Sequence, residues 1–213
     1  MNSVESILNQ EAIQQPTLQR PPEQETREVV KMVVVGKPGT GKTTVIQNEI
    51  LLPMLLKNRR ALIVTPHENE WENIPFVHWK FPERIRKYRG ARRIICHGEK
   101  DILDNISKNF VNGLLIFDDC KAYIKPGDRN YMESFLLALR QKDVDFVCCG
   151  HGFTTIPPVF YAFATHFVIF ATTDNPKKRK NDVMNYELLE KTVSYVNTIA
   201  KDNKHYYVTI ENQ

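Results

Sequence analysis

A glycine-rich octapeptide near the amino terminus constrains the fold of this chain more than any other feature. The apolar residues 33–35 stop at a glycine, and the chain then reads G-K-P-G-T-G-K-T over residues 36–43. A helical pattern follows, so the motif G-x-x-x-x-G-K-[ST] stands between a strand and a helix, as it must. Glycines let the backbone curl so that its N–H groups face phosphate oxygens, and a helix start adds its positive dipole end. The octapeptide predicts a phosphate-binding P-loop rather than a chance glycine loop.

The P-loop predicts both cofactors, ATP and Mg²⁺. Lys42 is expected to reach the β- and γ-phosphates, and the Thr43 hydroxyl to take one coordination position on Mg²⁺. The sequence carries no N-K-x-D guanine signature, which favours adenine as the base. The residues expected to bind the nucleotide are Gly36, Lys37, Pro38, Gly39, Thr40, Gly41, Lys42, Thr43 and Thr44.

A second motif, which is acidic, lies downstream of the P-loop. Four apolar residues, 114–117, end in Asp118 and Asp119, which is a Walker B pattern. Alone such a run is weak evidence, but after a complete P-loop it is strong. We expect Asp118 to hold Mg²⁺, directly or through water, and Asp119 to orient or deprotonate the attacking water. His151, between two glycines at the end of another apolar run, is placed to sense the γ-phosphate.

Length and composition are those of one α/β domain of ordinary size. The 213 residues divide into a flexible arm over 1–27, rich in Gln, Glu and Pro, and an ATPase domain over 28–213. Helices are expected at 43–56 (with Pro53 kinking or ending it), 101–110, 131–140 and 186–200. Strands are expected at 29–35, 61–65, 94–96, 114–117, 145–149, 166–170 and 206–210.

No apolar run is long enough to span a membrane, and no secretory signal is apparent. The four cysteines lie in or near apolar segments without C-x-x-C spacing, so buried thiols in a reducing compartment are expected. We therefore expect the protein in the cytoplasm, or in the virion if its source is a virus.

Two basic clusters are candidates for contact with nucleic acid. The first lies within residues 80–93, where aromatic residues interleave with the charges; the second is a run of four basic residues at 177–180. Phosphate contact, an arginine offered to a neighbouring subunit's ATP, and a plain solvated surface are all open readings of the first cluster. A basic surface loop is the alternative for the second. The candidate nucleic-acid contacts are Arg84, Arg86, Lys87, Arg89, Lys177, Lys178, Arg179 and Lys180.

The connection after the second strand is also of interest. Parallel sheets bind ligands at the carboxyl ends of their strands, and residues 67–71 leave such an end. Glu68, Glu70 or Trp71 can therefore face the nucleotide or a neighbouring subunit, with a surface loop as the alternative.

Together these motifs resemble the FtsK–HerA superfamily of DNA-pumping P-loop ATPases, and within it small viral packaging ATPases and Zot-like phage ATPases. The likeness covers about residues 31–173 and includes the P-loop, 64–66 with 70–71, 113–119, 139–141, 145–149, 151–153 and 156–158. The chain departs from the common pattern in carrying His151 where Gln is usual, Thr65 where Asp often ends the second strand, and Asp119 where many ATPases have Glu.

The resemblance implies an α/β fold of RecA or FtsK–HerA type, with a mostly parallel sheet flanked by helices. It implies a DNA translocase, such as a viral genome-packaging motor, that hydrolyses ATP as a homo-oligomeric ring (hexamer or pentamer) and docks on a capsid or portal-like protein. An arginine from a neighbour would complete each site, with Arg140 and the cluster at 84–93 as candidates. A small-molecule or nucleotide kinase and a non-motor assembly switch remain the alternatives.

Overall fold

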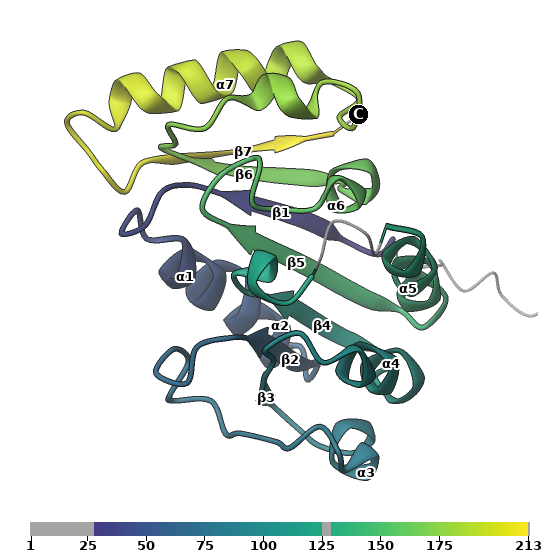
Figure 1. Cartoon of the computed structure of the whole chain (residues 1–213). Helices are drawn as coiled ribbons and strands as arrows, with labels where there is room; N and C mark the ends of the chain where they lie inside the picture. The colour runs from purple at the N-terminus through teal and green to yellow at the C-terminus, as the bar shows by residue number, and fades with distance from the viewer. Residues whose placement is uncertain (1–27, 125–128, 213) are drawn as a thin grey trace, which may run out of the picture.

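The structure is a computed structural model that describes residues 28–124 and 129–212. Its centre is one seven-stranded sheet in the order β3-β2-β4-β5-β1-β6-β7, parallel except for β7, which runs antiparallel to β6 (Figure 1). The strands are β1 (Lys31–Val35), β2 (Arg60–Thr65), β3 (Ala91–Ile95), β4 (Gly113–Phe117), β5 (Val144–Gly150), β6 (His166–Phe170) and β7 (Tyr207–Glu211).

Helices connect the strands and cover both faces of the sheet. They are α1 (Lys42–Val45), α2 (Leu52–Leu56), α3 (Pro82–Arg86), α4 (Lys100–Asn109), α5 (Arg129–Gln141), α6 (Pro158–Phe163) and α7 (Tyr186–Ile199). Short 3₁₀ turns form at η3 (Cys120–Ala122) and η5 (Pro176–Arg179). This arrangement confirms the predicted α/β class with a mostly parallel sheet.

Alternation along the strands divides the core into two layers. Val33 and Val35 of β1 pack with the face covered by α4 to α7, whereas Val34 packs with the face covered by α1 and α2. Successive strand residues point to opposite faces, and here both faces are buried, so the strands read as continuous apolar runs.

Pro53 lies inside the helix that follows the P-loop and does not end it. The residues just before it form a π-helical segment, η2 (Ile46–Leu51), and the Leu52 N–H bonds to the carbonyl of Gln47, five residues earlier. Proline has no N–H and its ring crowds the preceding turn, so the wider π turn accommodates it. The helix therefore continues to Leu56, as its apolar pattern predicts.

Some sequence expectations need adjustment. The strand expected at 94–96 begins at Ala91, and α6 was not predicted. The arm expected at residues 1–27 lies outside the described residues. Of the helices that the structure describes, none combines the length and apolar character needed to cross a bilayer.

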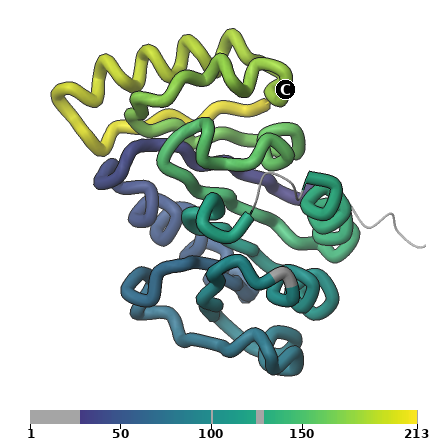
Figure 2. Tube along the Cα trace, in the orientation of Figure 1, coloured from purple at the N-terminus to yellow at the C-terminus, as the bar shows by residue number. Residues whose placement is uncertain are grey.

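Strand order places the predicted site. β5 lies between β1 and β4, and β2 lies beside β4, so four parallel strands end next to one another. The P-loop follows β1, the acids follow β4, and His151 follows β5. The carboxyl ends of these three parallel strands lie at one edge of the sheet, as the labelled strands of Figure 1 and the trace in Figure 2 show. Carboxyl-end clustering of this kind is what open parallel sheets use to bind ligands.

Candidate nucleotide site

The P-loop adopts a conformation that its glycines allow. Gly39 and Gly41 have φ of 74° and 92°, the left-handed region that other residues rarely enter. Gly36 is required for a different reason, because a Cβ there would lie 2.4 Å from Cβ of Phe170. The loop thereby packs against β6 while it turns from β1 into the helix.

Lys42 is held in the site by its own loop. Its Nζ donates to the carbonyl oxygen of Lys37 at 3.1 Å and lies 3.4 Å from Nδ1 of His151. Burial lowers the pKa of Lys42, an effect opposed by the nearby carboxylates of Asp118 and Asp119. The amine is thus a partly desolvated cation, positioned to meet a group of high negative charge.

A cavity of about 410 Å³ lies over the P-loop. Most of the predicted nucleotide-binding residues line it, together with both acids and three histidines. Gly36 and Thr40 lie buried beneath the loop, where the Thr40 hydroxyl donates to the carbonyl of Lys37 at 2.9 Å. The lining consists of Pro38, Gly39, Gly41, Lys42, Thr43, Thr44, His67, Glu70, Asp118, Asp119, His151 and His205.

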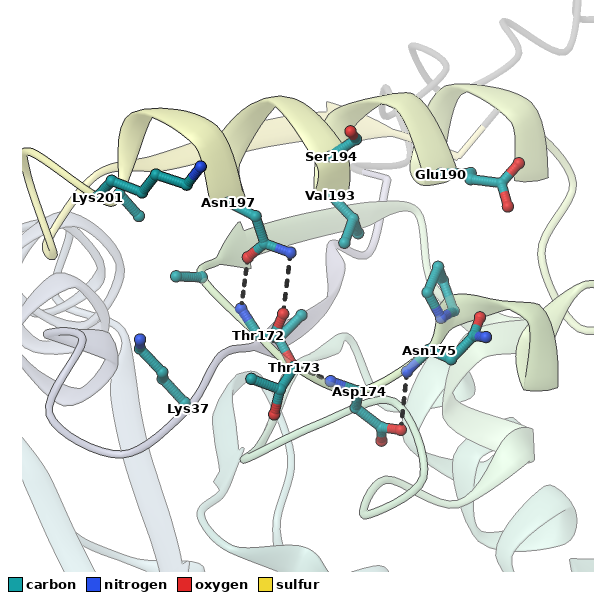
Figure 3. Close-up of a pocket in the computed structure, with 13 residues that line it drawn as sticks. Lys37, Thr172, Thr173, Asp174, Asn175, Glu190, Val193, Ser194, Asn197 and Lys201 are labelled. Carbon is teal, nitrogen blue, oxygen red and sulfur yellow. Dashed lines mark hydrogen bonds between the residues drawn. The ribbon is translucent and has the colours of Figure 1, made fainter.

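The Lys37 side chain faces a different space. It lines an open groove of about 720 Å³ between the connection after β6 and helix α7 (Figure 3). Asn197 of α7 fixes one wall, because its amide accepts from the Thr172 N–H and donates to the Thr172 carbonyl, both at 2.9 Å. Of the predicted nucleotide-binding residues, Lys37 thus contributes its backbone to the loop and its side chain to this groove.

Asp118 is buried and held by hydrogen bonds from its neighbours. Trp71 donates its indole N–H to Oδ2 of Asp118 at 2.8 Å. The hydroxyl of Tyr123 donates to the backbone carbonyls of Val64 and Asp118, which ties the end of β4 to β2. Burial, followed by a hydrogen bond with Asp118, raises the pKa of Glu70 to about 7. Glu70 and Trp71 therefore lie at the site, and the connection after β2 is not the plain surface loop that the sequence left as the alternative.

Trp71 reaches Asp118 from an uncommon backbone conformation. Its φ is 60°, which is rare for a large side chain, yet the residue is almost fully buried. Strained backbone of this kind persists where surrounding contacts fix it. Here the buried indole and its bond to Asp118 supply those contacts.

Asp119 turns away from Asp118 and meets two histidines. It adopts φ 43°, and its Oδ2 lies 3.2 Å from Nε2 of His67 and 4.0 Å from Nε2 of His151. Because His151 also approaches Lys42, the acid, the histidine and the lysine form one continuous set beside the P-loop.

The residue types in this cavity suit a nucleotide with bound Mg²⁺. The Thr43 hydroxyl and the Asp118 carboxylate, one from each motif, line the same cavity and offer the oxygen atoms that would hold Mg²⁺. Mg²⁺ is usually held by one or two carboxylates together with substrate phosphates and water.

Two histidines that line the cavity were not predicted from the sequence. His67 follows the end of β2, and the rule that polar residues after strand ends face ligands could have found it. His205 comes from the turn before β7, and its Nδ1 would lie 3.1 Å from a Cβ at Gly41. Nothing in the local sequence around His205 signals that proximity.

None of the predicted arginines lines this cavity. Helix α3 precedes β3, and Arg140, in the last turn of α5, lies near Lys31 at the start of β1, so both are at the amino edge of the sheet. Arg93 of the cluster at 84–93 lies in β3 and donates to the backbone carbonyl of Glu70, a residue that lines the cavity, but Arg93 itself is not among the lining residues. Within a chain the predicted arginines do not join the site.

The basic clusters divide into packed and exposed residues. Lys177, Lys178 and Lys180 are exposed, but Arg179 is not a surface contact. Its Nε donates to the carbonyl of Phe153 at 2.8 Å and its Nη2 to that of Ile156 at 3.1 Å. Arg179 therefore braces the connection between β5 and α6, which corrects its assignment to nucleic acid. Arg84, Arg86, Lys87 and Arg89 are exposed.

Comparison with known proteins agrees with this geometry. Residues 32–206 match the viral superfamily 1 RNA helicase core domain family. Curated proteins gave no significant match.

Solved structures are similar in fold at low identity. The genome packaging NTPase B204 from Sulfolobus turreted icosahedral virus 2, in complex with AMPPCP, has a TM-score of 0.68 and 13% identity, covering 86% of this chain and 93% of that one. The DNA-packaging ATPase B204 from Sulfolobus turreted icosahedral virus has a TM-score of 0.64, 13% identity and coverage of 86% and 92%. The predicted P-loop NTPase fold and its likeness to viral packaging ATPases are confirmed.

Proposed function

We propose that this chain, which belongs to the viral superfamily 1 RNA helicase core domain family, hydrolyses Mg²⁺-ATP to drive the movement of DNA. The observation that carries the proposal is the convergence of Lys42, Asp119 and His151 on one cavity from the ends of three strands. P-loop NTPase catalysis consists mainly of positioning the phosphates and stabilising the charge that builds up on them.

Each residue then has a task. Lys42 meets the β- and γ-phosphates, and Thr43 with Asp118 would hold Mg²⁺, which would neutralise charge on the phosphates. Asp119 accepts a proton from, or orients, the attacking water, and His67 at 3.2 Å helps to fix the carboxylate. His151 bridges Lys42 and Asp119 and senses whether the γ-phosphate is present.

The packaging role is the more specific part of the proposal, and similarity of fold supports it. Structures of viral packaging NTPases cover 86% of the chain, and such motors would work here as a hexameric or pentameric ring that docks on a capsid or portal-like protein. In a ring, the arginines at the amino edge, Arg140 among them, could complete a neighbour's site. The setting would be the host cytoplasm or the virion.

The family match favours a second candidate, movement along RNA. The matched family is described as an RNA helicase core, so RNA belongs beside DNA in every assay. ATP turnover measured with single-stranded DNA, duplex DNA and RNA tests both candidates at once. Stimulation by DNA supports the first, and stimulation by RNA alone supports the second.

A kinase or an assembly switch would behave differently. Phosphoryl transfer to a small acceptor that outpaced hydrolysis would replace the motor with a kinase. Slow turnover, unaffected by any nucleic acid, would favour the switch.

A further inference from the structure

The connection between β2 and α3 carries four aromatic rings at the outer edge of the sheet. Phe76 and Phe81 are exposed, at 53% and 45% of their surface. His78 lies between them, with its ring centroid 6.2 Å from that of Phe76 and 5.8 Å from that of Phe81. Trp79 stacks on His78 at 6.1 Å. We call Phe76, His78, Trp79 and Phe81 the aromatic cluster.

Cations surround the aromatic cluster. The Lys80 amine lies 5.6 Å from the ring centroid of Trp79, and the Arg84 guanidinium lies 4.7 Å from that of Phe81. Over residues 72–89 there are five Lys and Arg against two Glu. The exposed rings thus lie in a basic surface, which suits a polyanion with flat apolar groups.

The backbone beneath the rings is fixed. The Val77 N–H donates to the Arg93 carbonyl at 2.9 Å, and the Arg93 N–H donates to the Pro75 carbonyl at 3.0 Å. Asn105 of α4 donates to the carbonyl of Trp79 at 3.0 Å. This segment pairs with the edge strand β3 and is held from α4 as well, so Phe76 and Phe81 are presented from a rigid support.

We propose that the aromatic cluster is a stacking site for the unpaired bases of a single-stranded nucleic acid. The proposal rests on the function above and adds its binding site and the form of its substrate. Proteins that hold single strands combine aromatic platforms with a basic groove, because every base offers a flat face to a ring. A duplex hides those faces and would need only the cations.

The position of the cluster supports the proposal. The same connection begins at the nucleotide cavity, where His67 contacts Asp119 and Trp71 contacts Asp118. Arg93 ties its middle to β3 by donating to the carbonyls of Glu68 and Glu70. One continuous segment, near the lower edge in Figure 2, therefore joins the acids to the stacking site.

The test is binding of labelled strands to the full chain by fluorescence anisotropy. The probes are a DNA and an RNA single strand of about 20 nucleotides, longer than the 4–16 that single folds cover, and the matching duplex. The double variant Phe76→Leu/Phe81→Leu keeps apolar volume but removes the ring faces. Tyr195→Leu is the control, because Tyr195 is an exposed aromatic residue, 54% accessible, on the distant helix α7.

We expect single strands to bind more tightly than the duplex. The leucine double variant should bind them at least about 5-fold more weakly for each base that loses its ring. The slope of affinity against salt should stay the same, because no charge is removed. Phe76→Tyr/Phe81→Tyr, which keeps the rings, should bind like the native chain. If the double leucine variant fails to fold, the single variants Phe76→Leu and Phe81→Leu, each at an exposed position, carry the same test.

Three results would overturn the proposal. These are equal affinity for single strand and duplex, native affinity in the folded leucine variant, and a change of oligomeric state in that variant with binding unchanged. The last would make the cluster an interface between copies. The proposed function is refuted separately if the native chain binds no nucleic acid or does not hydrolyse ATP.

Discussion

The indole nitrogen of Trp71 lies 2.8 Å from Oδ2 of Asp118, with both residues buried. The bond joins the connection after β2 to the acid at the end of β4. It fixes the carboxylate that would hold Mg²⁺ and explains how Trp71 keeps its left-handed backbone.

Trp71→Phe should lower the free energy of unfolding by about 1–3 kcal/mol, because a buried carboxylate oxygen loses its donor. Urea denaturation without Mg²⁺ measures this loss. Trp79→Phe removes a similar volume from a half-buried tryptophan and serves as the control. An equal loss in both variants would show that volume, and not the bond to Asp118, sets the effect.

Asp119→Asn should keep ATP binding within a few-fold and slow hydrolysis by about 10²–10⁴. Asparagine tolerates the left-handed conformation of this position, so the fold should persist. Nucleotide titration and phosphate release measure the two quantities. Asp143→Asn is the matched control, since Asp143 has φ 54° at the far edge of the sheet. Normal turnover in Asp119→Asn would remove Asp119 from the water-activating role.

Glu70 predicts a pH dependence of stability in the metal-free protein. Burial and the bond with Asp118 raise the pKa of Glu70 from its ordinary value of about 4.5 to about 7, so the folded state binds more protons between these values. The free energy of unfolding should therefore fall as pH rises from about 4.5 through 7, and Glu70→Gln should flatten that part of the curve. Denaturation series in EDTA measure it, and an unchanged slope in Glu70→Gln would contradict the assignment.

Arg179→Ala should destabilise the fold by about 1–3 kcal/mol, since the carbonyls of Phe153 and Ile156 lose their donor. Lys178→Ala, one residue away and exposed, should stay within about 0.5 kcal/mol. Thermal or chemical denaturation compares them. Equal stability of the two variants would show that the hydrogen bonds of Arg179 do not stabilise the fold.

Local patterns were enough to predict the P-loop, the acids at 118–119 and the placement of His151. Each depends on a strand ending at a known edge of a parallel sheet, which sequence periodicity reveals. The helix at 186–200 was found for the same reason, and the structure has it as α7.

Contacts between distant segments could not be predicted in this way. His205 approaches the P-loop only because β7 pairs with β6, which lies beside β1. Arg179 sits in a basic run that looks exposed in sequence, but its side chain turns inward to two carbonyls. The strand β3 was placed too short because two arginines, Arg92 and Arg93, obscure its apolar pattern.

ATP turnover measured against protein concentration, with and without single-stranded DNA and RNA, tests the nucleic-acid motor most directly. Lys42→Ala is the blank, and it should fold while losing at least about 10²-fold in turnover. Turnover should rise steeply with protein concentration and rise again with nucleic acid, because subunits of a motor would share sites. Turnover indifferent to both would contradict the motor and leave a self-contained kinase or switch.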